Sequence, residues 1–187
     1  MNLNKNIFRA YDIRGIAYEE LSQETVVLIG KSLGTKSLES GNDSLVVGRD
    51  GRNSSPDLFD WIAAGIKSTG CNVINIGIVS TPILYFATHS LSCPNGVMIT
   101  GSHNPRNYNG FKVVKDKKTI SGKAIQEIRE TILKKEFLKG QGSEKALDVK
   151  DQYLDLIVNN IELKRPIRMA IDCGNGAASV IAKQVYE

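Results

Sequence analysis

The sequence predicts an α/β fold: a three-layer α/β/α domain with a mixed sheet, plus the beginning of a second, similar domain. Short apolar runs typical of buried strands alternate along the 187 residues with longer segments that have helical periodicity. Such alternation is typical of a sheet that is covered by helices on both faces. Residues 138–148 are rich in glycine and charge, as linkers are, so we place the domain boundary at the end of this stretch. The two domains are then residues 1–148 and 149–187.

The first hundred residues are predicted to contain three helices and three strands. Ser22 is a suitable N-cap for the first helix, and Pro56 stands in the first turn of the second helix, where its missing N–H is tolerated. We expect Trp61 to anchor the core and His89 to lie on a helix surface. In chain order, the elements are a helix over 22–37, a strand over 45–47, a helix over 55–70, a strand over 71–76, a helix from 81 through 89 and a strand over 96–99.

A hairpin and one more helix complete the first domain. A strand over 110–114 is predicted after a turn at Asn109-Gly110, and the charged residues around Asp116 indicate a hairpin tip. The segment 121–135 is predicted to be a helix, because its isoleucines recur at helical spacing.

The second domain is predicted to begin with a helix, a strand and another helix. These elements span residues 152–161, 167–173 and 177–187. One βα unit cannot form a sheet by itself, so we expect the strand to lack partners. The expected apolar face of the first of these helices carries Tyr153, Leu156, Ile157 and Asn160.

Composition and charge narrow the class of protein. The chain is 41% apolar, which is enough for a core, and its net charge of +4 is mild. The lysines that could suggest nucleic-acid binding lack interleaved aromatic residues and flank Asp116. We therefore interpret them as part of a solvated turn, with Lys112 excepted because it belongs to a motif described below. The lysines concerned are Lys112, Lys115, Lys117 and Lys118.

Cysteine content and hydropathy indicate the compartment. Cys71, Cys93 and Cys173 are odd in number and lack metal-like spacing, so we expect buried thiols in a reducing compartment. Residues 1–7 lack the apolar core of a signal peptide, and the sequence has no run of about 18 apolar residues. We expect a cytoplasmic protein that binds neither membranes nor nucleic acid.

The candidate site is a serine on a polar loop. Residues 100–105, Thr-Gly-Ser-His-Asn-Pro, follow the predicted strand over 96–99, so Ser102 is expected just past the carboxyl end of a strand. Open α/β sheets build their sites at such ends. A histidine, His103, is adjacent, and Lys112 follows in the segment 108–112, Tyr-Asn-Gly-Phe-Lys. This arrangement suits a serine that carries a phosphoryl group.

Two other interpretations of the serine compete with this one. Ser, Asn, Gly and Pro are ordinary turn formers, and by composition alone a plain turn is the better interpretation. A hydrolase nucleophile is disfavoured, because Asn104 stands where the G-x-S-x-G motif needs its second glycine. His103 is also poorly placed to act as the base for an adjacent serine.

Three further segments favour the phosphoserine interpretation. Arg14 precedes Gly15 in the segment 8–15, which suits a guanidinium directed at a phosphate. The segments 45–52 and 169–176 are each an apolar strand that enters a glycine-containing turn. Each segment alone is a weak signal, since such turns are common and usually structural.

Taken together, in this order and spacing, the four segments resemble the α-D-phosphohexomutase family, most closely its bacterial phosphomannomutase/phosphoglucomutase branch. The resemblance covers residue 8 to the C-terminus, and Ser102-His103-Asn104-Pro105 is the family's phosphoserine signature. Tyr11-Asp12 and the segment 108–112 look like the mannose/glucose branch. The glucosamine branch usually has Thr-Asp-Gly-Ile-Arg-Gly and Asp-Asn-Gly-Ile-Lys at these places and fits less well.

The resemblance implies roles for individual residues. Ser102 resembles the phosphoryl carrier, and as phosphoserine it also resembles a metal ligand. Lys112 resembles the general acid/base and contacts phosphate, and His103 resembles a residue that assists near the transferring phosphate. Arg14 looks like a phosphate-contacting catalytic cation, and Tyr11 resembles a substrate-binding residue.

Other motif residues are implied to be structural. Asn104 and Asn109 are expected to shape the serine loop, and Arg49 and Arg52 to brace it. The glycine-containing loop 173–176 lacks the third glycine of a dinucleotide fingerprint, and in this family it is a structural turn.

The resemblance implies an enzyme, an intramolecular phosphotransferase that interconverts hexose 1-phosphate and 6-phosphate through a phosphoserine and a bisphosphorylated sugar. Its cofactor would be Mg²⁺, with glucose 1,6-bisphosphate as activator and mannose or glucose phosphates as substrates. Family members have four domains, so we expect this chain to be an N-terminal fragment that lacks the metal and sugar-specificity loops and is inactive alone. The alternatives are a phosphoglucosamine mutase, a phosphate-binding module without turnover, and a phosphoprotein domain used for interaction.

Overall fold

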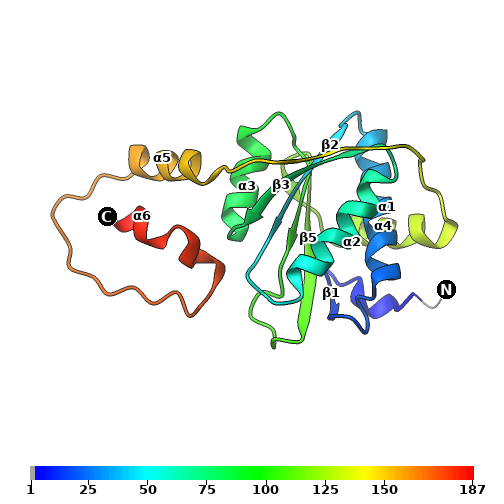
Figure 1. Ribbon diagram of the computed structural model, residues 1–187, viewed down its shortest axis with the longest axis horizontal. Coiled ribbons are helices and arrows are strands. Elements are labelled where there is room, and N and C mark those ends of the chain that lie inside the picture. Colours follow the sequence, from blue (N-terminus) through cyan, green and yellow to red (C-terminus); the bar gives the residue numbers. More distant parts are fainter. Residues whose placement is uncertain (1–2) are drawn as a thin grey trace.

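The computed structural model describes residues 3–187; Met1 and Asn2, part of the segment examined for a signal peptide, lie outside the described residues. Its centre is a seven-stranded sheet of order β1-β5-β4-β2-β3-β7, with β6 paired to β5 (Figure 1). The strands β2, β3, β4 and β7 are parallel, whereas β5 is antiparallel to its neighbours. The predicted mixed sheet is therefore confirmed. The strands are β1 Ile13–Ile16, β2 Ser44–Arg49, β3 Asn72–Ile78, β4 Gly96–Ile99, β5 Tyr108–Lys115, β6 Lys118–Thr119 and β7 Glu144–Ala146.

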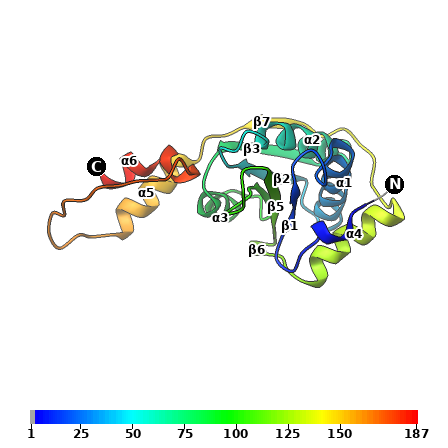
Figure 2. The same ribbon diagram turned by 90° about the horizontal axis from the view of Figure 1, so that it is seen from below.

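Helices cover both faces of the sheet, as predicted for a three-layer domain (Figure 2). Helices α1 (Gln23–Glu39), α2 (Ser55–Lys67) and α4 (Lys123–Lys134) pack on one face, and α3 (Thr81–Ser90) packs on the other. Strand β2 shows why both faces must be covered, because Val47 belongs to the core under α1 and α2 while Val46 belongs to the core under α3. A short helix, η1 (Lys5–Ile7), precedes β1.

Local sequence signals fix the starts of α1 and α2 where they were expected, whereas α2 ends at Lys67 and not at the predicted Gly70. The hydroxyl of Ser22 accepts a hydrogen bond from the N–H of Thr25 at 3.3 Å, which confirms Ser22 as the N-cap of α1. Pro56 lies at the start of α2, as predicted. Trp61 is only half-buried at the edge of the core, so it is a weaker anchor than expected. No helix within residues 3–187 has the length and apolar character needed to cross a membrane.

The segment interpreted as a linker instead extends the sheet. Strand β7 pairs with β3, and the N–H of Val73 donates to the carbonyl of Ser143 at 2.9 Å. The glycines have a steric reason, because a Cβ at Gly142 would lie 2.0 Å from the carbonyl oxygen of Cys71. They allow this segment to approach the edge of β3 and to pair its exposed backbone groups. The linker interpretation was wrong because glycine marks close approach as well as flexibility.

The predicted turn at Asn109-Gly110 is also wrong, because both residues lie inside β5. The chain reverses earlier, where the N–H of Tyr108 donates to the carbonyl of Pro105 at 3.0 Å. Asn109 is fully buried, and its side chain is held by Ser54 and Ser55. These tertiary contacts override the turn preference of the Asn-Gly pair. The hairpin tip at Asp116 is confirmed, with positive φ at that residue.

The C-terminal part lies beyond α3 and differs from the prediction (Figures 1 and 2). Residues 167–173 form no strand in the described structure, since no partner strand is present to pair with them. The predicted final helix is a 3-10 helix, η2 (Ala177–Val180), followed by α6 (Ala182–Tyr186). Helix α5 (Lys150–Asn160) is half-buried at Tyr153, Leu154 and Ile157, whereas Leu156, which was expected on the packed face, is exposed.

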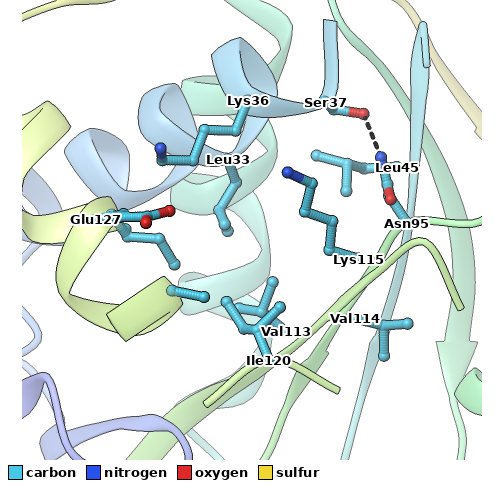
Figure 3. A pocket seen from close by; sticks show the side chains of 12 residues that line it. Leu33, Lys36, Ser37, Leu45, Asn95, Val113, Val114, Lys115, Ile120 and Glu127 are labelled. Atoms are coloured by element: carbon cyan, nitrogen blue, oxygen red, sulfur yellow. Dashed lines mark hydrogen bonds between the residues drawn. The ribbon is translucent and has the colours of Figure 1, made fainter. Parts of the chain in front are cut away.

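A small apolar hollow remains between α1, α4 and β5 (Figure 3). Its volume is about 70 Å³, whereas ligand pockets are usually about 300 Å³ or larger. Two of its polar side chains pair with each other, because the amide of Asn95 donates to the hydroxyl of Ser37 at 3.0 Å. We therefore interpret the hollow as imperfect packing. The side chains that line it include Leu33, Val113, Ile120, Ala124 and Ile128.

Filling this hollow should stabilise the protein. Ala124 lines it from α4, and leucine has almost the same helix propensity as alanine. We expect Ala124→Leu to raise the free energy of unfolding by about 0.5–2 kcal/mol. Urea denaturation measures this change, with Lys123→Leu as the control on an exposed position of the same helix. A loss of stability in Ala124→Leu would mean that the hollow cannot accept the added carbons.

Candidate active site

The serine loop leaves the sheet at the end of β4 and presents Ser102 to solvent. The N–H of Ser102 donates to the hydroxyl of Thr100 at 2.9 Å, and the N–H of Asn104 donates to the carbonyl of Gly101 at 3.1 Å. These bonds hold Ser102 at φ +53°, a left-handed conformation that non-glycine residues rarely adopt. Ser102 therefore lies where it was predicted, just past the carboxyl end of a strand.

Arg52 holds this loop through four hydrogen bonds to backbone carbonyls. One terminal nitrogen donates to Pro105 at 2.7 Å and to Tyr108 at 3.0 Å. The other donates to Ser102 at 2.9 Å and to Asn104 at 2.7 Å. The predicted bracing role of Arg52 is confirmed. With its N–H groups occupied in this way, Arg52 fixes the backbone and is not available to bind phosphate.

Asp50 completes the clamp from the end of β2. One of its carboxylate oxygens lies 3.4 Å from Nε of Arg52 and accepts a hydrogen bond from the N–H of Gly101 at 3.2 Å. The other accepts from Ser55 at 2.6 Å. Arg49, which was also expected to brace the loop, makes a single side-chain hydrogen bond within residues 3–187, to the carbonyl of Asp50 at 3.4 Å. That expectation was wrong, because Asp50 takes the role.

The clamp explains the glycine before the serine. A Cβ at Gly101 would lie 2.4 Å from the guanidinium of Arg52, and 2.8 Å from the carbonyl oxygen of Tyr108. No larger residue fits between the serine loop and the arginine. Asn104 acts on the loop, as expected, since its amide donates to the carbonyl of Gly101 at 3.1 Å. The amide of Asn109 instead donates to Ser54 and Ser55 at the start of α2, so its role in shaping the serine loop stays a prediction.

A second polar cluster joins β1 to β5. Asp12 and Arg14 form a buried ion pair, with 8% and 7% of each residue exposed. Nζ of Lys112 lies 3.7 Å from the same carboxylate of Asp12. The register explains this meeting, because Arg14 lies opposite Gly110 on an antiparallel pair and Asp12 is therefore opposite Lys112.

The same register places this cluster on the face of the sheet that α3 covers. Lys112 lies opposite Met98 of β4, which belongs to the core beneath α3. Arg14 and Thr100 both lie opposite Gly110, so they share a row across the sheet. Nε of Arg14 is buried and has no hydrogen-bond partner within residues 3–187. A buried donor without a partner needs an explanation, and an anion bound at Arg14 would provide one.

A hollow of about 810 Å³ opens beside the serine loop. It is bordered by Ser102 and Arg106 from that loop and by Tyr18 from the turn after β1. Residues 174–177 close another side. The volume lies in the range of small-molecule sites.

The structure separates the predicted site residues into two groups. Oγ of Ser102 lies 3.4 Å from Nδ1 of His103, and Ser102 lines the large hollow. Arg14 and Lys112 form the second group, and Asp12 links them. None of these three residues lines the large hollow. Tyr11 is 73% exposed, next to this second group in sequence.

Sequence reasoning missed Asp12, Asp50 and Tyr18. Asp50 could have been found, since it follows a buried strand in the turn that carries Arg52. The roles of Asp12 and Tyr18 depend on partners far along the chain, Lys112 and Asp57, and on a register that the sequence does not specify.

The cysteines are free thiols, as expected. Burial raises the pKa of Cys71 to about 12 and also raises the pKa of Cys93. Both thiols are therefore protonated and unreactive at neutral pH. Cys173 is only half-buried, which corrects the expectation that all three would be buried.

The structure is an α/β/α domain that carries an exposed serine on a loop held by Arg52 and Asp50. Comparison with known proteins identifies the family to which such a domain belongs. The chain belongs to the phosphoglucomutase/phosphomannomutase family, whose alpha/beta/alpha domain I matches residues 5–139. The resemblance drawn from the motifs is thus confirmed.

Individual relatives agree with this assignment. The chain is 44% identical over 99% of its length to a phosphomannomutase/phosphoglucomutase of Pseudomonas aeruginosa, and 45% identical over its full length to a phosphoglucomutase of Neisseria meningitidis serogroup B. It spans only 40% and 41% of these two proteins. A crystal structure of a phosphoglucomutase/phosphomannomutase family protein from Burkholderia thailandensis superposes with a TM-score of 0.94 at 38% identity, over 99% of this chain and 42% of that one.

Proposed function

We propose that this chain is the phosphoserine-bearing domain of a hexose phosphate mutase that interconverts the 1-phosphates and 6-phosphates of mannose or glucose. The observation that carries the proposal is the setting of Ser102. Its hydroxyl is exposed beside a hollow of about 810 Å³, while the carbonyls around it are tied down by Arg52. A fixed backbone and a free hydroxyl suit a group that repeatedly accepts and donates phosphate.

The reaction consists of two phosphoryl transfers. The phosphoryl group passes from Oγ of Ser102 to the free hydroxyl of a hexose monophosphate. The Oγ–P bond breaks as the new P–O bond forms, and the proton of the sugar hydroxyl is transferred to Oγ. The resulting bisphosphorylated sugar turns end for end. It then returns its other phosphoryl group to Oγ, so that phosphate has migrated between positions 1 and 6. Glucose 1,6-bisphosphate can charge the serine and would act as the activator.

The second cluster supplies the charge that such transfers need. We propose that Lys112 moves the proton to and from the sugar hydroxyl and contacts phosphate. Arg14 is proposed to bind phosphate through its buried and unpartnered Nε. His103, which is 3.4 Å from Oγ of Ser102, would assist beside the transferring group, and Tyr11 would contact substrate. Phosphoryl transfer depends mainly on such positioning and on cations.

Mg²⁺ is the cofactor that the family generally uses, but the described residues alone do not make a site for it. Within residues 3–187, no three His, Cys, Asp or Glu side chains are grouped to hold a metal. A phosphorylated Ser102 would add oxygen ligands of the kind that Mg²⁺ prefers. We therefore assign no step of the reaction to the metal.

We propose residues 1–148 as the first domain and residues 149–187 as the start of a second one. The match of the family's domain I to residues 5–139 supports the first unit. The cytoplasm is the proposed compartment, because the buried free thiols of Cys71 and Cys93 suit reducing conditions.

Phosphate mapping tests the proposal. Glucose 1,6-bisphosphate should place one phosphoryl group on Ser102 of the full-length protein, which should then interconvert the hexose phosphates in a coupled assay. Residues 1–187 alone should show no turnover, because they lack the carboxylates for Mg²⁺. A phosphoryl group mapped to another serine would contradict the proposal. Turnover by residues 1–187 at an ordinary rate of about 1–10³ s⁻¹ would contradict the second expectation.

A further inference from the structure

Tyr18 has an unusual backbone conformation for an aromatic residue. It lies in the turn that follows β1, where the N–H groups of Glu20 and Leu21 both donate to the carbonyl of Ile16. Its φ is +70°, in the left-handed region that bulky side chains avoid. Strain of this kind persists only where surrounding contacts enforce it, and it is concentrated at functional sites.

Three contacts hold the tyrosine in place. Its hydroxyl donates to the carboxylate of Asp57 in the first turn of α2 at 2.8 Å. Its ring meets that of Trp61 edge to face, with 5.9 Å between centroids. Backbone pairing ties its turn to the serine loop, since the N–H of Ala17 donates to the carbonyl of Asn107 at 2.8 Å. The hydrogen bond to Asp57 raises the pKa of Tyr18, so the phenol stays a donor at neutral pH.

In spite of these contacts, 53% of Tyr18 remains exposed. The residue lines the large hollow together with Ser102, Arg106 and Asn107, and no other aromatic residue of the described chain lines it. The hollow therefore has one aromatic wall, which the turn after β1 contributes. A pinned tyrosine ring offers contact area at little cost in conformational entropy.

We propose that Tyr18 is a positioning residue whose ring packs against the apolar C–H face of the hexose while a phosphoryl group moves to or from Ser102. The inference rests on the proposed function. A hexopyranose ring has C–H groups on its faces and most of its hydroxyls around its rim, so an aromatic wall fixes the plane of the ring without selecting one hydroxyl. Such a contact suits an enzyme that must accept the same sugar in two orientations.

The conformation of Tyr18 separates this role from a structural one. If the residue served only the fold, its removal would lower the melting temperature. If instead it is kept for the sugar, Tyr18→Gly should relieve the left-handed strain and leave the melting temperature unchanged or higher, while it weakens substrate binding. Stability and binding would then move in opposite directions.

The test compares full-length variants. Tyr18→Gly should raise KM for glucose 1-phosphate about tenfold, the value of one good aromatic contact, and change kcat less. Tyr18→Phe keeps the ring and should stay within about threefold of the wild-type KM. Asparagine tolerates the left-handed region, so Tyr18→Asn provides a second variant without the ring if the glycine variant folds poorly. Lys135→Gly is the control, since Lys135 also has a positive φ, +56°, but lies at the end of α4 away from the hollow.

Trp61 offers a readout that does not depend on turnover. It is the only tryptophan of these 187 residues and touches the ring of Tyr18. Its indole N–H resonance should shift when glucose 1-phosphate binds to the wild type and should not shift in Tyr18→Gly. An active wild type with an unchanged KM in both ring deletions would overturn the role of Tyr18 alone. A wild type that neither phosphorylates Ser102 nor turns over substrate would overturn the proposed function, and this inference with it.

Discussion

Replacing Ser102 with alanine should abolish phosphoryl transfer and leave the fold intact. The hydroxyl is the proposed acceptor, and no other serine is predicted to replace it. Its one side-chain contact within residues 3–187 is the 3.4 Å approach to His103. The bonds that order the loop use the backbone of Ser102, whose N–H binds Thr100 and whose carbonyl binds Arg52. We therefore expect the free energy of unfolding to change by less than about 0.5 kcal/mol.

The measurement is incorporation of phosphate from glucose 1,6-bisphosphate, followed by intact mass and by turnover in a coupled assay. Ser92→Ala provides a matched control, because Ser92 is exposed and lies away from the loop, just before Cys93. The control should incorporate phosphate as the wild type does. Normal stoichiometry in Ser102→Ala would remove Ser102 from the mechanism.

The alternation of strands and helices could be predicted from the sequence because it depends on local patterns. The run 96–99 is apolar at every position, and all four residues of β4 are buried. Likewise, Ile125, Ile128 and Ile132 recur at helical spacing and are the buried residues of α4. Where burial follows directly from the periodicity of apolar residues, a single sequence is enough to predict the strand or helix.

The errors arise where backbone partners are distant. Glycines 140 and 142 indicated a linker, but they allow close contact with the edge of β3, some seventy residues earlier in the chain. Asn109-Gly110 indicated a turn, but Ser54 and Ser55 hold the asparagine inside a strand. Local preference is weak compared with several buried hydrogen bonds, and the partners cannot be identified from spacing alone.

In the candidate site, too, the features that depend on local sequence were predictable and those that depend on distant partners were not. The position of Ser102 follows from a short apolar strand and a polar loop, so it was predictable. The pairing of Lys112 with Asp12 requires the register of β1 on β5, and a shift of β1 by one residue would put Asp12 on the opposite face of the sheet from Lys112. The geometry therefore adds what the motif lacks, namely a carboxylate that holds both Arg14 and Lys112 on one face of the sheet.

The carboxylate of Asp12 determines what we expect when Lys112 is changed to methionine. Methionine keeps much of the aliphatic stem and removes the charge and the proton. Asp12 keeps Arg14 as its partner, so no buried carboxylate is left unpaired and the fold should persist. The side chain of Lys112 is 26% exposed, which leaves its ammonium accessible to a sugar hydroxyl.

We expect phosphate already on Ser102 to remain in Lys112→Met, while transfer to and from sugar slows by about 10²–10⁴, the usual effect of losing a general acid/base. Lys115→Met is the matched control, since it makes the same substitution on the same strand at a residue that lines the small hollow under α1 and α4. Arg14→Ala should slow transfer as well, but partly through a higher KM, because it removes a phosphate contact. Rapid mixing of each phosphorylated variant with glucose 1-phosphate separates these effects. Single-turnover transfer at the wild-type rate in Lys112→Met would show that the proton moves through another group, and the ion pair with Asp12 would then serve only to join β1 to β5.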